Sequence, residues 1–167
     1  MHRDARGFFC ERFRKDVFAE AGFDPDSFVQ DNFSRSLPGV VRGLHAQYNE
    51  PQGKLVTCIS GRIFDVAVDL RVASPTFGQS INAELSGEEP RWLWVPAGFA
   101  HGFCVLGDEP ADVLYKVDRV YSASGECGVR WDDPELEIAW PQDRPPLLSP
   151  KDKALPDFAA YRLAPHF

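Results

Sequence analysis

KLVTCISGRIFDVAVDLR, residues 54–71, contains two β-prone runs on either side of Ser60-Gly61. Both runs are rich in β-branched and other apolar residues, and the Ser-Gly pair is typical of a tight turn. Successive side chains of a strand point to opposite faces. Four apolar side chains therefore share one face of the second run: Phe64, Val66, Val68 and Leu70. The other face carries Asp65 and Asp69. The stretch predicts two strands joined by a tight turn, the second with two carboxylates on one side.

The same kind of short apolar run, closed by glycine or proline, recurs along the chain from Phe28 onward. It predicts strands at residues 54–60, 62–71, 91–95, 102–106 and 112–121. A single early helix is predicted at residues 11–21, where Phe13 and Val17 are spaced i, i+4 and Gly22 follows as a cap. Many short strands and almost no helix favour a closed β-barrel or jelly roll over an α/β fold.

Length and composition set limits on the kind of protein. The 167 residues suit one domain, 1–167, and 44% hydrophobic residues suffice for a globular core. The net charge of −7 argues against a nucleic-acid binder, although a local basic pocket is compatible with it. The four cysteines never stand in a CxxC spacing, so we expect free thiols. Without a secretory h-region or a membrane-length apolar run, we expect no membrane partner and a cytoplasmic location.

Of the four histidines, His45 and His101 are the candidates for chemistry, because His2 and His166 stand near the ends of the sequence. PAGFAH, residues 96–101, has the PxGxxH form of the second cupin motif. Metal cupins carry HxH and a glutamate in the first motif, but here Gln47 and Lys54 stand at those places. A neutral amide and a cation make a poor metal site, which predicts a cupin cavity without its metal. The alternative for His101 is a structural histidine bonded to backbone at the barrel mouth.

His45 lies close in sequence to Arg42 and Lys54, and Asp65 follows. Neighbouring cations favour a neutral imidazole, which suits a general base, and a lysine beside a carbonyl oxygen stabilises an enolate. The alternative is a solvated charged edge. Tyr115 and Tyr121 have the same parity on the predicted strand 112–121, so they either line a cavity together or are ordinary amphipathic barrel residues, which the pattern alone favours.

Ser149-Pro150-Lys151-Asp152 has the form of a helix capping box, with a hydroxyl N-cap, proline at N1 and a carboxylate at N3. Capping is the first interpretation of Asp152. The second is a carboxylate that orients a catalytic histidine.

Several blocks, taken in order, resemble the dTDP-4-dehydrorhamnose 3,5-epimerase family. They include ARGFFCERF (5–13), QDNFSRSLPGVVRGLHAQ (30–47), WVPAGFAHGF (94–103), LYKVDRVY (114–121) and LSPKD (148–152). The resemblance implies an all-β, cupin-type jelly-roll barrel with short peripheral helices. It also implies a homodimer, no metal or organic cofactor, and a dTDP-4-keto-6-deoxyhexose as substrate.

The resemblance further implies roles for matching positions. His45 would be the base, Asp152 its partner, Lys54 the stabiliser of the enolate oxygen and Tyr115 the acid on the opposite face. Tyr121 would stack on thymine. The remaining candidate binding residues are Arg6, Glu11, Gln30, Asp31, Asn32, Arg42, Asp65, His101, Glu126 and Lys151. Lys151 stands where an arginine is frequent; lysine keeps the charge but not the two-pronged geometry.

Two departures from the family pattern concern packing. Members usually carry an extra N-terminal strand that crosses to the partner subunit, and this sequence starts almost at Arg6-Gly7; Ala46 stands where an aromatic residue is frequent. The predicted reaction is inversion of carbons 3 and 5. The alternatives are inversion of one carbon in another deoxysugar pathway, a metal-dependent cupin enzyme, which stoichiometric metal would reveal, and a catalytically silent sugar-nucleotide-binding module.

Overall fold

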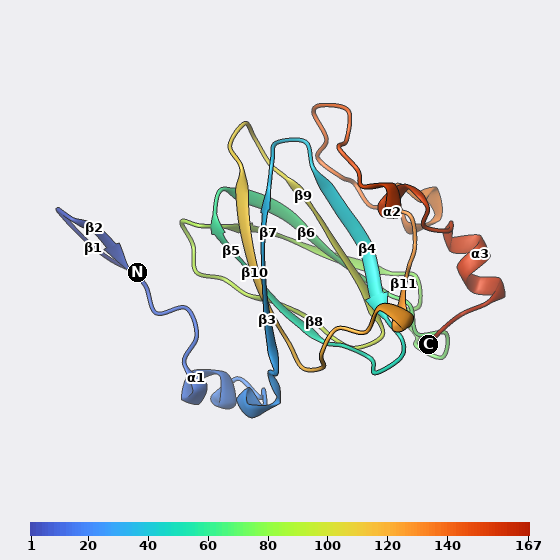
Figure 1. Cartoon of the computed structure of the whole chain (residues 1–167), viewed down its shortest axis with the longest axis horizontal. Coiled ribbons are helices and arrows are strands. Elements are labelled where there is room, and N and C mark those ends of the chain that lie inside the picture. The colour runs from blue at the N-terminus through green and yellow to red at the C-terminus, as the bar shows by residue number, and fades with distance from the viewer.

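Two antiparallel sheets form the body of the protein in a computed structural model that describes residues 1–167 (Figure 1). One sheet has the order β3 (Gln30–Ser36), β10 (Ala111–Val117), β5 (Lys54–Ser60) and β8 (Leu93–Val95). The other has the order β11 (Glu126–Gly128), β4 (Val41–Gln47), β9 (Phe99–Val105), β6 (Arg62–Asp69) and β7 (Ser80–Ser86). The facing sheets make a jelly roll, which confirms the all-β prediction.

The turn at Ser60-Gly61 takes the chain from one sheet to the other. β5 has the predicted bounds and β6 ends at Asp69, two residues before the predicted end. Gly61 has φ +73°, and a Cβ on it would lie 2.4 Å from the carbonyl oxygen of Pro110. The glycine is therefore needed for both the conformation and the close approach.

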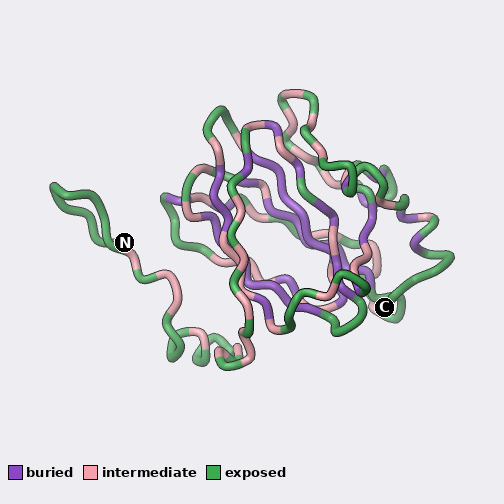
Figure 2. Tube along the Cα trace, viewed as in Figure 1, coloured by how far each residue is buried: buried purple, intermediate pink, exposed green.

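β6 is buried on both faces and separates two cores. Ile63 and Ala67 point between the sheets, into a core shared with Val56, Phe103 and Val113. The opposite face packs under the C-terminal segment, in a core formed by Leu44, Val66, Val68, Leu70, Ala100, Val129, Phe158 and Tyr161. Buried residues concentrate on the strands in Figure 2. Both faces of β6 are therefore fixed by packing.

The N-terminal part differs from prediction. The helix α1 is Lys15–Glu20, shorter than the predicted residues 11–21. Arg12 instead lies in an extended segment, where its guanidinium donates to the carbonyls of Cys58 and Gly87 and its own carbonyl accepts from Trp92. These contacts with the barrel outweigh local helix propensity. Before them, β1 (His2–Asp4) and β2 (Gly7–Phe9) form an exposed hairpin that projects from the barrel (Figure 1).

The last predicted strand, residues 112–121, is also too long. β10 ends at Val117, and the chain then enters a loop that includes the 3-10 turn η2 (Ala123–Gly125). Tyr115 is on the strand and Tyr121 is on the loop. The prediction that parity places both on one face of one strand is therefore wrong.

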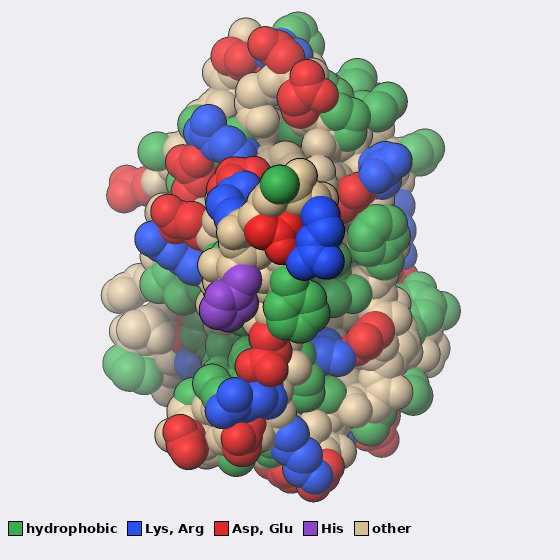
Figure 3. Space-filling model, turned by 90° about the vertical axis from the view of Figure 1, so that its left-hand side faces the viewer, with side chains coloured by type: hydrophobic (Ala, Val, Ile, Leu, Met, Phe, Trp, Pro, Cys, Tyr) green, Lys and Arg blue, Asp and Glu red, His purple; other side chains and the backbone are tan.

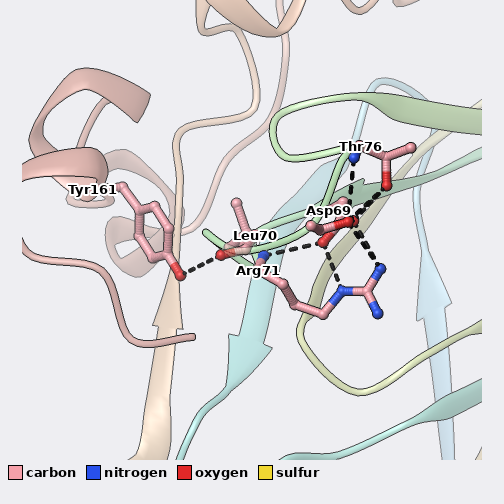
Figure 4. Close-up of polar contacts among 6 residues, drawn as sticks. Asp69, Leu70, Arg71, Thr76 and Tyr161 are labelled. Atoms are coloured by element: carbon pink, nitrogen blue, oxygen red, sulfur yellow. Dashed lines mark hydrogen bonds and ion pairs between the residues drawn. The ribbon is translucent and has the colours of Figure 1, made fainter.

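After β11, the chain covers the outer face of the five-stranded sheet. It forms η3 (Pro134–Leu136), α2 (Pro150–Lys153) and α3 (Phe158–Leu163), while η1 (Pro25–Ser27) lies earlier, between α1 and β3. The Tyr161 hydroxyl donates to the carbonyl of Leu70 over 3.0 Å, which ties α3 to the end of β6 (Figure 4). No helix is long and apolar enough to cross a membrane.

Asp69 organises the turn after β6 (Figure 4). Its buried carboxylate accepts from the backbone N–H and guanidinium of Arg71 and from the hydroxyls of Ser74 and Thr76, at 2.5–3.0 Å. Burial would raise the pKa of Asp69, but these donors outweigh it and lower the pKa below its usual range. This carboxylate serves the fold and not the cavity.

Replacing Asp69 by asparagine should lower the free energy of unfolding by about 3 kcal/mol, because the buried charge network loses its centre. Asp132, which pairs with Arg130 in the same two-residue spacing but at the surface, is the matched control. Asp132→Asn should cost less than about 1 kcal/mol. Because the folded-state pKa of Asp69 is lowered, its stabilisation is present above about pH 4 and is lost as the pH falls. Urea unfolding at pH 7 and pH 3 measures both effects; equal costs for the two variants would contradict the assignment.

Candidate active site

A cavity of about 220 Å³ opens between the two sheets at one end of the barrel. Its walls come from β3, β5 and β10 in one sheet, from β4 and β11 in the other, and from the loops that follow β4 and β10. They are Gln30, Asn32, His45, Ala46, Gln47, Gln52, Lys54, Tyr115, Tyr121 and Glu126. A deeper hollow of about 90 Å³ shares His45, Lys54 and Tyr115 with it and adds Ser34, Arg42, His101, Gly102 and Phe103. These two hollows form one site with His45, Lys54 and Tyr115 at the junction.

His45 is paired with Asp152. Its Nε2 lies 2.7 Å from Oδ1 of Asp152, although the approach is too bent for a straight hydrogen bond. Catalytic contacts of this kind often tighten only when substrate binds. The nearest charge to the imidazole is thus a carboxylate, whereas the sequence pattern pointed to neighbouring cations.

Asp152 also caps α2, so the capping interpretation is confirmed, while its role in orienting a catalytic histidine stays a prediction. Its Oδ2 accepts from the hydroxyl of Ser149 at 2.5 Å and from the Ser149 backbone N–H at 3.2 Å, while Oδ1 faces His45. Burial would raise the pKa of Asp152, but His45, Ser149 and the N–H of Gly43 lower it below its ordinary range. The carboxylate stays ionised and fixed in place at neutral pH.

Gly43 permits this arrangement. It has φ +112°, and a Cβ on it would lie 2.6 Å from Cα of Gly102 and 2.7 Å from the carbonyl oxygen of His101. Its N–H donates to Asp152 over 3.2 Å. The pairing between β4 and β9 is irregular between Arg42 and His45, and this irregularity accompanies the turn of the Gly43 N–H toward α2.

A second histidine and carboxylate lie deeper. Nε2 of His101 is 2.6 Å from Oδ1 of Asp65, and both side chains are buried. The second carboxylate oxygen of Asp65 and the hydroxyl of Ser34 are buried without a partner. His101 is therefore bonded to a side chain, not to backbone as the structural alternative required, and it lines the deeper hollow.

Lys54 and Tyr115 have pKa values that suit acid–base work. Lys54 is 8% exposed, and its ammonium donates to the carbonyl of His45 over 3.1 Å. Burial lowers the pKa of Lys54 to about 8, against the opposing influence of Cys127, Asp65 and Glu126. Burial raises the pKa of Tyr115, which keeps its hydroxyl protonated at neutral pH. Tyr115 enters the cavity from β10 and His45 enters from β4, so the two come from opposite sheets.

Tyr121, Glu126 and Lys151 form the outer rim. The Tyr121 hydroxyl donates to Glu126 over 2.9 Å, and Lys151 is paired with the same carboxylate. Tyr121 is 54% exposed beside the cavity. Although the strand prediction for Tyr121 is wrong, the loop brings it to the same pocket as Tyr115.

Five predicted binding residues line neither hollow within one chain. Asp65 is buried against His101, and Lys151 is at the rim beside Glu126. Arg6 bonds Asp4 in the N-terminal hairpin, Glu11 lies in the extended segment after it, and Asp31 faces outward to pair with Lys116. The sequence reasoning also missed cavity residues, above all Gln47 and Gln52. Alternation along β4 was the available signal for Gln47, because it has the same parity as His45.

The cavity contains no group of three or more histidine, cysteine or acidic side chains placed to hold a metal. The expectation of a reaction without metal stays a prediction. A larger hollow of about 540 Å³ lies beside the hairpin, but no histidine, tyrosine, lysine or cysteine lines it. The jelly roll and the histidine, lysine and tyrosine around one cavity define the class: a cupin-type barrel equipped for proton transfer.

Comparisons with known proteins agree with this class. The family model described as dTDP-4-dehydrorhamnose 3,5-epimerase matches residues 1–160. The enzyme of that name from Pseudomonas aeruginosa is 53% identical over 156 residues, covering 93% of this chain and 86% of the relative. A dTDP-4-dehydrorhamnose 3-epimerase from Streptomyces niveus is 44% identical over 151 residues, covering 90% and 72%.

The crystal structure of the Legionella pneumophila 3,5-epimerase in complex with dTDP-4-keto-L-rhamnose has a TM-score of 0.88 and 50% identity, and the match covers 93% of this chain and 82% of that one. The protein belongs to the dTDP-4-dehydrorhamnose 3,5-epimerase family and is an isomerase with the cupin jelly-roll fold.

Proposed function

We propose that this isomerase, one domain over residues 1–167, inverts carbons 3 and 5 of dTDP-4-dehydro-6-deoxy-D-glucose to form dTDP-4-dehydro-L-rhamnose. One observation carries the proposal. His45, which is paired with Asp152, and the protonated Tyr115 reach the same cavity from opposite sheets, and the buried Lys54 lines that cavity as well. Inversion beside a ketone needs a base on one face of the sugar and an acid on the other.

In the proposed mechanism, His45 removes the proton from the carbon beside the 4-keto group. The electron pair moves onto the keto oxygen, where the ammonium of Lys54 stabilises the enolate. Tyr115 then donates its proton to the carbon from the other face, and solvent restores both groups. Asp152 orients the imidazole and stabilises its cationic form. The cycle repeats at the second carbon, with no change in oxidation state.

The rest of the pocket is proposed to hold the nucleotide sugar. Tyr121 offers an exposed aromatic face for thymine, and Gln30, Asn32 and Glu126 line the same cavity. Arg42 and Lys151 supply positive charge for the diphosphate. His101, held by Asp65, completes the deep end where the sugar is proposed to lie.

The test is incubation with the 4-keto sugar nucleotide in deuterated water, followed by NMR of the product. Deuterium at carbons 3 and 5 supports double inversion. Deuterium at one carbon supports the alternative, a single-centre epimerase. The similarity to the Streptomyces niveus 3-epimerase is the reason for testing this alternative. No incorporation would contradict both, and would favour a catalytically silent binding module.

The pKa of Lys54 predicts an alkaline limit to the reaction. The ammonium form stabilises the enolate and is lost as the pH rises through about 8. We therefore expect kcat/KM to fall about ten-fold per pH unit above that value. Lys54→Arg should have a lower kcat/KM but no fall up to about pH 10, because arginine stays charged. Because the pKa of Tyr115 is raised, its hydroxyl loses its proton only at higher pH. If kcat/KM of Lys54→Arg still falls above about pH 8, the fall is caused by the titration of a group other than Lys54.

We further propose a cytoplasmic homodimer in which the N-terminal segment reaches the partner's pocket. Arg6 and Glu11 lie on this segment, away from the cavity of their own chain, and the hairpin exposes Phe8 and Phe9 at 51% and 70%. On this face of the molecule, hydrophobic side chains lie among acidic and basic ones (Figure 3). Four free cysteines fit a reducing compartment.

The crossing can be tested by complementation. Arg6→Ala and His45→Ala chains, each weakly active or inactive alone, should regain activity when co-expressed, because one pocket of the mixed dimer is then intact. Light scattering measures the dimer independently. No recovery in a mixed dimer of demonstrated composition would place Arg6 outside the partner's pocket.

A further inference from the structure

The middle of the loop that carries Tyr121 is held by side-chain amides. The loop runs from the end of β10 to β11 and has no ladder of its own beyond the 3-10 turn. Gln52 Nε2 donates to the carbonyl of Arg119 at 2.6 Å, and Gln47 Nε2 donates to the carbonyl of Val120 at 3.2 Å. The next two backbone N–H groups are also taken by glutamines. That of Tyr121 donates to Gln30 Oε1 at 3.0 Å, and that of Ser122 donates to Gln47 Oε1 at 2.8 Å.

Four consecutive residues are thus fixed by Gln30, Gln47 and Gln52, here named the glutamine clamp. The three come from β3, from β4 and from the loop between β4 and β5. They therefore tie the Tyr121 loop to both sheets at once. Gln47 is hydrogen-bonded to Val120 and Ser122, the residues before and after Tyr121. It therefore restricts the backbone that carries the Tyr121 ring.

Gln47 and Gln52 line the cavity, yet their polar atoms are turned toward backbone. Gln47 is 3% exposed and also donates to the carbonyl of Glu50 at 2.7 Å, so both of its N–H donors and its oxygen are in use. Gln52 is 8% exposed. A glutamine satisfied in this way offers little to a ligand, but breaking its bonds releases the loop.

The neighbours of the clamp hold the same loop at its two ends. The carboxylate of Asp118 accepts from the backbone N–H of Gly53 at 2.7 Å. The N–H of Tyr48, next to Gln47, donates to the carbonyl of Gly125 at 2.8 Å. Between these fixed points Tyr121 is exposed, and its side chain is held only at the hydroxyl, which donates to Glu126.

We propose that Gln47 and Gln52 are positioning residues that hold the Tyr121 ring ready for a nucleobase, and so set the affinity for the nucleoside diphosphate. The inference rests on the proposed stacking role of Tyr121. It explains why the place of a metal ligand in other cupins holds a neutral amide here: a glutamine at residue 47 supplies two donors and an acceptor to a loop, which a histidine bound to metal does not.

The expected effect on Kd follows from the fraction of molecules in which the Tyr121 ring is in place. With the clamp intact the ring is already in place; without it, only part of the molecules present the ring correctly, and the apparent Kd rises by the inverse of that fraction. For Gln47→Met, which keeps the side-chain length but removes all three bonds, we expect a three- to ten-fold rise in Kd. Gln52→Met, which removes one bond, should give a smaller rise in the same direction.

The experiment is calorimetric titration of the intact protein with dTDP, alongside steady-state kinetics. Gln47→Met should raise Kd and KM while kcat stays within about two-fold of the parent, because the reacting atoms are untouched. Gln79→Met is the matched control, since Gln79 is exposed and outside the cavity, and it should change neither constant. Amide hydrogen exchange should become faster at Ser122 in Gln47→Met but not in the control.

A double-mutant cycle with Tyr121→Ala separates positioning from general damage. Loss of a stacking ring should raise Kd at least about five-fold in the parent. In Gln47→Met the same change should raise Kd less, because the ring is already misplaced. Fully additive effects, or unchanged Kd in Gln47→Met and Gln52→Met while Tyr121→Ala weakens binding, would overturn the clamp.

An unchanged Kd in Tyr121→Ala alone would instead contradict the proposed stacking role. In that case the exchange rate at Ser122 still decides whether Gln47 holds the loop. If Gln47→Met fails to fold, Gln52→Met, with a single bond at stake, provides the same comparison.

Discussion

Replacing His45 by alanine is expected to lower proton exchange at both sugar carbons by about 10²- to 10⁴-fold, the usual contribution of a general base. His45 is the one imidazole at the junction of the two hollows that is backed by a carboxylate on a separate helix. The alanine variant keeps the pocket walls and the Tyr121 loop. Binding of dTDP should therefore remain within about two-fold of the parent value.

Deuterium incorporation followed by NMR measures the first quantity, and calorimetric titration measures the second. His166→Ala, exposed near the C-terminal end and outside both hollows, is the matched histidine control and should exchange at the parent rate. Asp152→Asn should also slow exchange strongly, because the amide cannot stabilise the imidazolium. Exchange at the parent rate in His45→Ala would remove this residue from the mechanism.

Tyr115→Phe is expected to separate exchange from inversion. Without the hydroxyl, the enolate still forms through His45, and the base returns a proton or deuteron to the same face. Deuterium should therefore enter recovered substrate while inverted product falls by about 10²-fold or more. The measurement is NMR of substrate and product from one incubation. It gives both the deuterium content of the recovered substrate and the amount of inverted product.

Tyr161→Phe removes a hydroxyl on the other side of the sheet, where it binds the carbonyl of Leu70. It should lower stability but leave the ratio of exchange to inversion unchanged. If Tyr115→Phe slows exchange and inversion equally, the tyrosine does not act as the proton donor.

The fold could be predicted where the apolar runs are strong. β5 and β6 could be predicted closely because each is a short run rich in apolar and β-branched residues, and a Ser-Gly turn separates them. β3, with the sequence QDNFSRS, has one aromatic residue among polar ones, and its pairing with β10 supplies what its composition does not. The extra predicted turns of helix before Lys15 fail because Arg12 has better partners on the barrel.

The site is less accessible to sequence reasoning, because its contacts join distant residues. Nothing in the spacing of His45 and Asp152 indicates that they lie close together. The family resemblance implied the pair, whereas the capping box predicted only the contact of Asp152 with Ser149. Asp65 and Asp69 alternate in step on β6, yet one meets His101 and the other the turn that follows the strand. The amides of Gln47 and Gln52 point to a loop whose course no local pattern fixes.

The position of Asp152 in the chain has a consequence for synthesis. Every strand of both sheets is complete by Gly128, whereas the carboxylate of the histidine pair comes from a helix made afterwards. Domains take shape from the N-terminus as the ribosome proceeds. A growing chain therefore has all the strands around its cavity before it has Asp152, and under the proposed mechanism the base is completed only when α2 has emerged and docked on β4.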